Sequence, residues 1–190
     1  MTSLNNIFKF GILLGTVILV LNACKKSEIY PDIPAIEFKS YYYKLDTSVQ
    51  GVRDTLLGII IGYKDGDGDI GLNKGDTFAP FNSVKVNDKE TNKYRYNLYE
   101  EYYALNPITN VFEPVIKPNT LDTLIYTGRV ENITPDGKHK AIRGEIDWQN
   151  PIPSQIEFPD MPRIIKVRVR IYDRALHESN TVESPEIILP

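Results

Sequence analysis

The stretch Ile164-Ile165-Lys166-Val167-Arg168-Val169-Arg170-Ile171-Tyr172 alternates apolar and charged side chains almost without interruption. Successive side chains of a β-strand point to opposite faces of its sheet. The apolar residues of this stretch would therefore face a core, and its lysine and arginines would face water. Because this half-wet alternation is typical of antiparallel sheets, the stretch predicts an antiparallel all-β fold.

The rest of the chain repeats this pattern in short runs rich in Ile, Val, Tyr and Phe, which Pro, Gly, Asn and Asp interrupt about every ten residues. Only at residues 98–105 does helical spacing compete, through Leu98, Tyr102 and Leu105, but the tyrosine content there favours a strand. We expect strands at 36–43, 55–63, 94–103, 111–115, 121–127, 141–148, 164–172 and 182–189.

About seven to nine short strands without long helices predict a single immunoglobulin-like β-sandwich. The alternative is a lipocalin-like up-and-down barrel, which closes its sheet edges around an apolar ligand.

The N-terminus carries the features of an exported protein. Lys9 precedes an apolar run at residues 10–21 that is too short to span a bilayer comfortably, which predicts a signal peptide at residues 1–23. The run ends in Leu21-Asn22-Ala23-Cys24, which resembles the bacterial lipobox, and Cys24 is the only cysteine in the chain. The alternative is a short membrane anchor followed by a chance cysteine.

The lipobox resemblance implies covalent lipid on Cys24, which would hold the protein on a membrane. Residues 24–34 are polar and contain two prolines, which predicts an extended tether before a domain at residues 35–190. We expect a lipid-anchored protein of the cell envelope, at the outer membrane, on either the periplasmic or the surface-exposed face.

Charge narrows the possible partners. Removal of the signal peptide takes away one lysine and leaves 167 residues with 21 basic and 25 acidic side chains. A phosphate-binding protein needs a basic face, so this balance argues against nucleic acid. With Cys24 bound to lipid, the mature chain has no disulfide and depends on an apolar core.

A second conspicuous stretch, Asp65-Gly66-Asp67-Gly68-Asp69-Ile70-Gly71, directly follows the predicted strand at 55–63. Calcium prefers about six to eight oxygen ligands, and glycines allow a loop to fold successive carboxylates around one ion. The stretch is not an EF-hand, because that motif requires glycine where Ile70 stands. The alternative is a solvated turn without metal, since Asp-Gly pairs are common in hairpins.

The loop that follows Tyr172 offers further ligands. If the strands that end at Tyr63 and Tyr172 run toward the same end of the domain, their loops are neighbours. Asp173, and Asn180 or the Ser179 hydroxyl, would then join Asp65, Asp67 and Asp69 around one calcium ion. Arg174 has two interpretations: it pairs with Asp173 or Asp69, or it projects into solvent.

The lipobox, the Asp65-Gly66-Asp67-Gly68-Asp69-Ile70-Gly71-Leu72 loop and the loop from Tyr172 to Asn180 together resemble a family of uncharacterised Bacteroidetes lipoproteins. The likeness covers most of the mature chain, although only the two loops are sharp motifs. The resemblance implies a location and a β-sandwich, and it transfers no catalytic residue.

Signatures of enzymes are missing from the sequence. It contains no Gly-x-Ser-x-Gly, phosphate loop or His-Glu-x-x-His motif, and Glu100 and Glu101 would point to opposite faces of a strand. His139 and His177 lack neighbouring zinc ligands. We therefore expect a non-catalytic protein, and a hydrolytic enzyme is the less favoured alternative.

The aromatic content offers another class of function, a glycan-binding module. Aromatic side chains stack on sugars through their flat faces and bind through their polar tips, although tyrosines in strands more often pack against neighbouring strands. The candidates for a stacking platform are Tyr94, Tyr96, Tyr99, Tyr102, Tyr103 and Trp148. The main prediction is a binding or structural module whose partner is an envelope protein or a glycan.

Overall fold

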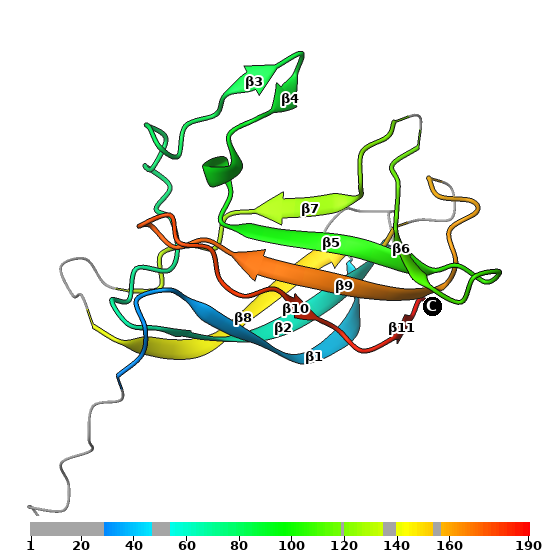
Figure 1. The fold of residues 1–190 in the computed structure, drawn as a ribbon, viewed down its shortest axis with the longest axis horizontal. Coiled ribbons are helices and arrows are strands. Elements are labelled where there is room, and N and C mark those ends of the chain that lie inside the picture. The colour runs from blue at the N-terminus through cyan, green and yellow to red at the C-terminus, as the bar shows by residue number, and fades with distance from the viewer. Residues whose placement is uncertain (1–28, 47–53, 119, 135–139, 154–156) are drawn as a thin grey trace, which may run out of the picture.

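The computed structural model describes residues 29–46, 54–118, 120–134, 140–153 and 157–190. The predicted signal peptide (residues 1–23), Cys24 and His139 lie outside these residues. The described strands form two larger antiparallel sheets and one short hairpin (Figure 1).

The first sheet has three long strands in the order β1-β2-β8, all antiparallel: β1 (Ala35–Asp46), β2 (Asp54–Asp65) and β8 (Ile142–Pro151). The second sheet is built on β5 (Leu98–Leu105) and β9 (Ile164–Ile171), which pair along most of their lengths. Its short outer strands are β6 (Phe112–Pro114) and β7 (Ile125–Gly128) beside β5, and β10 (Val182–Glu183) and β11 (Ile187–Ile188) beside β9. The hairpin consists of β3 (Lys85–Val86) and β4 (Lys89–Glu90).

The prediction of an antiparallel all-β fold is confirmed. Among the described residues, the one helical element is the 3₁₀ turn η1 (Lys93–Arg95). The described residues contain no helix that is long and apolar enough to cross a bilayer. The strand order of neither described sheet closes on itself, so the alternative of an up-and-down barrel is wrong. The helical alternative at residues 98–105 is also wrong, because β5 buries every second side chain, starting from Leu98.

Several predicted boundaries differ from the structure. Residues 94–97 do not extend β5, because Asn92 caps η1 and its side chain accepts a hydrogen bond from the Tyr94 amide at 3.0 Å. The predicted last strand divides into β10 and β11 around Pro185, which has no N–H for the ladder. The β3–β4 hairpin was not predicted; Asn87 and Asp88 make its two-residue turn, with φ of 49° and 61°.

The inner faces of both sheets contribute to one hydrophobic core. Alternate residues of β2 and β9 are buried, each with an exposed fraction of at most 2 %. They are Leu57, Ile59 and Ile61 of β2 and Ile165, Val167 and Val169 of β9. β5 adds Leu98 and Tyr102, which are also fully buried. The alternation that predicted β9 thus separates its core face from Lys166, Arg168 and Arg170, which are half-buried on the other face.

A carboxyl group interrupts this apolar interior. Glu100 lies on the inner face of β5 and is fully buried. Its Oε1 accepts a hydrogen bond from the Tyr102 hydroxyl at 3.1 Å, and its Oε2 accepts one from the Asn150 amide of β8. Burial raises the pKa of Glu100 to about 7. Glu100 therefore forms a polar connection between β5 and β8 inside the core.

This position of Glu100 predicts a specific pH dependence. Its pKa is about 7 in the fold and near 4.5 in the unfolded chain. Its contribution to stability is therefore complete below about pH 4.5 and is lost as the pH rises through 7. We expect Glu100→Gln, a neutral mimic, to gain stability relative to the wild type across this interval, by at most about 1.4 kcal/mol per pH unit. Urea unfolding from pH 4.5 to 8.5 measures the difference.

The other carboxyl groups titrate in both proteins, so the difference isolates Glu100. Glu186→Gln, which changes an exposed glutamate, serves as the control and should follow the wild type. Parallel stability curves for Glu100→Gln and the wild type would contradict the prediction.

Candidate metal centre

The loops that follow β2 and β9 lie at the same end of the domain, as the sequence predicted (Figure 1). Ile70 and Asp173 form an antiparallel bridge between them. The Arg174 amide donates to the Asp69 carbonyl oxygen at 3.2 Å, and the Ala175 amide donates to Asp69 Oδ2 at 2.9 Å. We call the four aspartates of these loops, Asp65, Asp67, Asp69 and Asp173, the acidic pole.

Three carboxylates of the acidic pole converge. Asp65, Asp69 and Asp173 each offer one oxygen atom, and these atoms lie within 4.8 Å of one another. Asp65 and Asp173 are almost fully buried, with exposed fractions of 0 % and 1 %. Hard cations such as calcium prefer oxygen ligands of this kind. The three carboxylates therefore form a group that could hold a metal ion.

Three oxygen atoms of the acidic pole have no hydrogen-bond donor. Asp65 Oδ2 accepts from the Asp69 amide at 2.9 Å, just as Asp69 Oδ2 accepts from the Ala175 amide. The second oxygens, Oδ1 of Asp65, Asp67 and Asp69, are buried and have no hydrogen-bond partner. Buried oxygen atoms without a partner are unfavourable in a folded protein. A cation among these atoms would remove that penalty.

The electrostatics of the pole point the same way. Burial, together with repulsion from the neighbouring aspartates, raises the pKa of Asp65 to about 7 and that of Asp69 to about 6. Burial also raises the pKa of Asp173, although hydrogen bonds from His177 oppose the shift. Ionising these groups together is unfavourable unless a positive charge compensates them.

A histidine that the sequence did not mark as part of the site contacts the acidic pole. The His177 amide donates to Asp173 Oδ1 at 2.7 Å, and its ring Nδ1 lies 2.9 Å from Asp173 Oδ2. This hydrogen bond raises the pKa of His177. The spacing of four residues between Asp173 and His177 in one loop was the only sequence signal for this pair. His177 orients the Asp173 carboxylate toward the pole.

The structure uses Asn180 and Ser179 for other contacts. Asn180 Oδ1 accepts from the Ile36 amide and its Nδ2 donates to the Ile36 carbonyl, both at 2.8 Å. The Ser179 hydroxyl accepts from the Ile171 amide and donates to the Asn180 carbonyl oxygen. Asn180 therefore joins the loop after β9 to the start of β1.

Both interpretations of the Arg174 side chain were wrong. Its guanidinium forms an ion pair with Asp76 rather than with Asp69 or Asp173, and it is not free in solvent. The Arg174 backbone faces the pole, while the side chain extends beyond it to the segment that follows Leu72. Arg174 thus leaves the oxygens of the acidic pole available.

Glycines allow the acidic loop to pack closely against other segments. The Gly66 amide donates to the Pro31 carbonyl oxygen at 2.8 Å, and a side chain at Gly66 would collide with the backbone of Tyr30 and Pro31. Gly71 has a φ of 105°, and a side chain there would collide with the backbone at Glu131. The glycines therefore allow the loop to pack between residues 30–31 and residues 131–132.

The predicted aromatic platform does not form one surface. Tyr102 is fully buried in the core, where its ring meets Tyr126 edge to face. The guanidinium of Arg168 lies 4.2 Å from the ring centre of Tyr103, and that of Arg170 lies 4.9 Å from the ring centre of Tyr99. Tyr102 therefore lies outside any exposed platform, whereas Tyr99 and Tyr103 share the other, half-buried face of β5.

Comparisons with protein family models, curated proteins and solved structures find no match to this chain. The resemblance to Bacteroidetes lipoproteins stays a prediction. The case for a metal ion at the acidic pole therefore depends on the three converging carboxylates.

The packing of the acidic loop predicts a contrast between two glycines. Gly71→Ala should lower the free energy of unfolding by roughly 1–3 kcal/mol, because it combines a positive φ with a backbone collision. Gly75→Ala, only four residues away, should change it by less than about 0.5 kcal/mol, because nothing lies within 4 Å of the added methyl group. Urea unfolding of both variants checks this, and equal effects would contradict the assigned geometry.

Proposed function

We propose that the protein is a lipid-anchored module of the cell envelope that binds or organises a partner without catalysis. Its domain, residues 35–190, is an immunoglobulin-like β-sandwich in this proposal, and a calcium ion at the acidic pole orders the two loops there. The observation that carries the calcium site is the set of three buried aspartate oxygens without hydrogen-bond partners, beside the converging carboxylate of Asp173.

A bound calcium ion, rather than a lysine or arginine side chain of the protein, would compensate the charge of the acidic pole. Among the described residues, no lysine or arginine forms an ion pair with Asp65, Asp67 or Asp69. The basic side chain that contacts these aspartates in the described part of the chain is His177, whose ring Nδ1 lies 2.9 Å from Asp173 Oδ2. A divalent cation would compensate the repulsion and would link the loop after β2 to the loop after β9.

The arrangement of the other carboxylates supports a non-catalytic role. Glu100 faces the core and is fully buried, whereas Glu101 faces outward and pairs with Arg170. The two therefore cannot act together on one bond, as the pair of carboxylates in a glycosidase does. A pole ordered by calcium would instead present a defined surface to an envelope partner.

Calcium should stabilise the mature protein. At a calcium concentration of about 100 times Kd, binding to the native state adds about 2.7 kcal/mol. For a chain of this length, this corresponds to a Tm increase of about 5–10 °C over the protein in chelator. Differential scanning calorimetry at pH 7.5, with calcium and with chelator, measures the shift. An unchanged Tm together with no heat of calcium binding would refute the site.

Neutral variants make the calcium test sharper. Asp69→Asn and Asp173→Asn keep an oxygen for their backbone hydrogen bonds and remove one charge each. In chelator, they should be at least as stable as the wild type, because repulsion is relieved; in calcium, they should be less stable. Glu186→Gln should respond to calcium as the wild type does. If either aspartate variant differed from the wild type in stability by the same amount in calcium and in chelator, calcium binding at the acidic pole would be contradicted.

The lipid anchor has an independent test. A cell that expresses the full chain with an alkyne-labelled fatty acid should incorporate the label into the wild type and not into Cys24→Ser, because the thioether requires this thiol. The variant should leave the membrane fraction. Ala175→Ser, in an exposed loop position, is the control and should remain labelled. Equal labelling of Cys24→Ser would contradict lipid attachment at this residue.

A further inference from the structure

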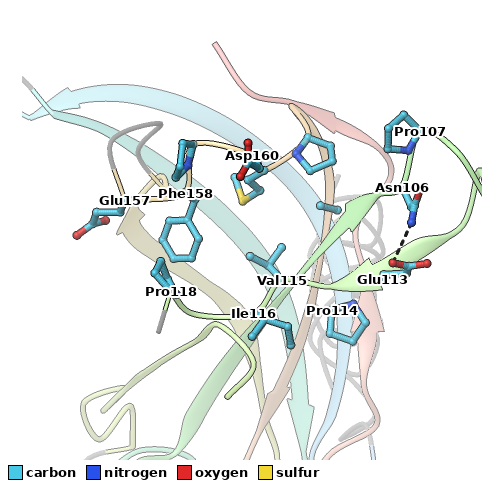
Figure 2. A pocket seen from close by; sticks show the side chains of 14 residues that line it. Asn106, Pro107, Glu113, Pro114, Val115, Ile116, Pro118, Glu157, Phe158 and Asp160 are labelled. Atoms are coloured by element: carbon cyan, nitrogen blue, oxygen red, sulfur yellow. Dashed lines mark hydrogen bonds between the residues drawn. The ribbon is translucent and has the colours of Figure 1, made fainter. Parts of the chain in front are cut away.

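A separate pocket opens at the other end of the domain from the acidic pole. It lies where β5 and β6 end and the segment at 157–162 passes beside them, and it has a volume of about 530 Å³ (Figure 2). β5 has eight residues and runs from the side of the acidic pole to the pocket. At about 3.4 Å per residue, this separates the two sites by roughly 25 Å.

Much of the pocket wall is apolar. Val115 and Met161 are members of the hydrophobic core, and Phe158 packs against that core. Figure 2 shows the Phe158 ring opposite Val115 and Ile116 across the pocket. Prolines account for five of the fourteen residues that line it, and their fixed φ angles limit the ordering that a ligand would have to impose.

The charges around this apolar wall all have one sign. Among the described residues that line the pocket, Glu113, Glu157 and Asp160 are the ionisable ones, and none is a lysine, arginine or histidine. The Asn106 amide donates to Glu113 Oε2 at 3.1 Å and so holds that carboxylate beside the pocket (Figure 2). All three residues are exposed, so they form an acidic rim around the apolar wall, and water screens part of its attraction for a cation.

We propose that this pocket binds a small amphiphilic ammonium compound. The apolar body of the ligand would lie against Phe158, Val115 and Met161, and its ammonium group would face the acidic rim that includes Glu113 and Asp160. The volume is in the range of small-molecule sites, and such sites combine an apolar lining with a few polar groups that set specificity. A neutral apolar molecule would gain no attraction from the acidic rim, and the rim would repel an anion.

Three probes that differ only in their polar end test the proposal: 3-phenylpropylamine, 3-phenylpropan-1-ol and 3-phenylpropanoate. Isothermal titration and saturation-transfer NMR use the mature lipoprotein in micelles of dodecyl maltoside, a detergent without an ammonium group, with empty micelles as the blank. We expect the amine to bind about tenfold more tightly than the alcohol, in line with a charge-assisted hydrogen bond, and the carboxylate to bind most weakly. Equal binding of the amine and the alcohol, or no binding of any probe, would overturn the proposal.

Variants separate the charged and apolar parts of the site. Asp160→Asn and Glu113→Gln should each weaken the amine about threefold to tenfold and leave the alcohol unchanged, while Phe158→Ala should weaken both probes. Glu186→Gln is the matched control and should change neither affinity. Thermal unfolding confirms that each variant folds. Amine binding that survives the Glu113→Gln/Asp160→Asn double variant would refute the assigned charges.

The experiment is independent of the calcium proposal. The pocket and the acidic pole share no residue, so amine binding should be the same in calcium and in chelator. A failure of the calcium site would leave the probe affinities unchanged, and a failure of the pocket would leave the calcium response unchanged.

Discussion

The backbone bridge between Ile70 and Asp173 joins the two sheets at one end of the domain, and much of the surrounding structure depends on it. Ile70 follows β2 of the first sheet, and Asp173 follows β9 of the second. The bridge extends the pairing of buried strands into two loops that would otherwise separate, and it forces four aspartates together. Ile70 is itself almost fully buried, so the apolar core continues up to the carboxylates. The acidic pole is therefore part of the core's boundary rather than a free surface turn.

Glycines and carboxylates act together in this region. Gly66 and Gly71 bring the loop so close to neighbouring backbone that side chains would collide there, and this packing excludes water from the aspartates. Exclusion of water then raises the pKa of Asp65 and Asp69 and leaves their Oδ1 atoms without donors. The close packing of the loop thus also explains the raised pKa values and the unpartnered carboxylate oxygens.

Local patterns in the sequence account for the strands and for the position of the pole. The alternation at 164–172 predicted β9, and the shared direction of β2 and β9 was enough to place Asp173 near Asp65 and Asp69. Pairing between distant side chains could not be read in this way. Asn150 meets Glu100 across 50 residues, and Asp76 meets Arg174 across 98, and neither partner is marked by a local pattern. The pocket likewise combines the predicted strand at 111–115 with segments near residues 106 and 160, which no local pattern brings together.

The hydrogen bond from the Gly66 amide to the Pro31 carbonyl oxygen has a mechanical consequence. Pro31 lies in the segment that leads back toward Cys24, so a force applied at the N-terminus reaches the acidic loop before it reaches the sheets. Farther along the chain, the Asn180 side chain forms two hydrogen bonds with the backbone of Ile36. A cation that locks the two loops would strengthen both attachment points and would resist the peeling of β1 from β2. In a tethered molecule, the strength of this grip under load would then depend on the ion concentration around the domain.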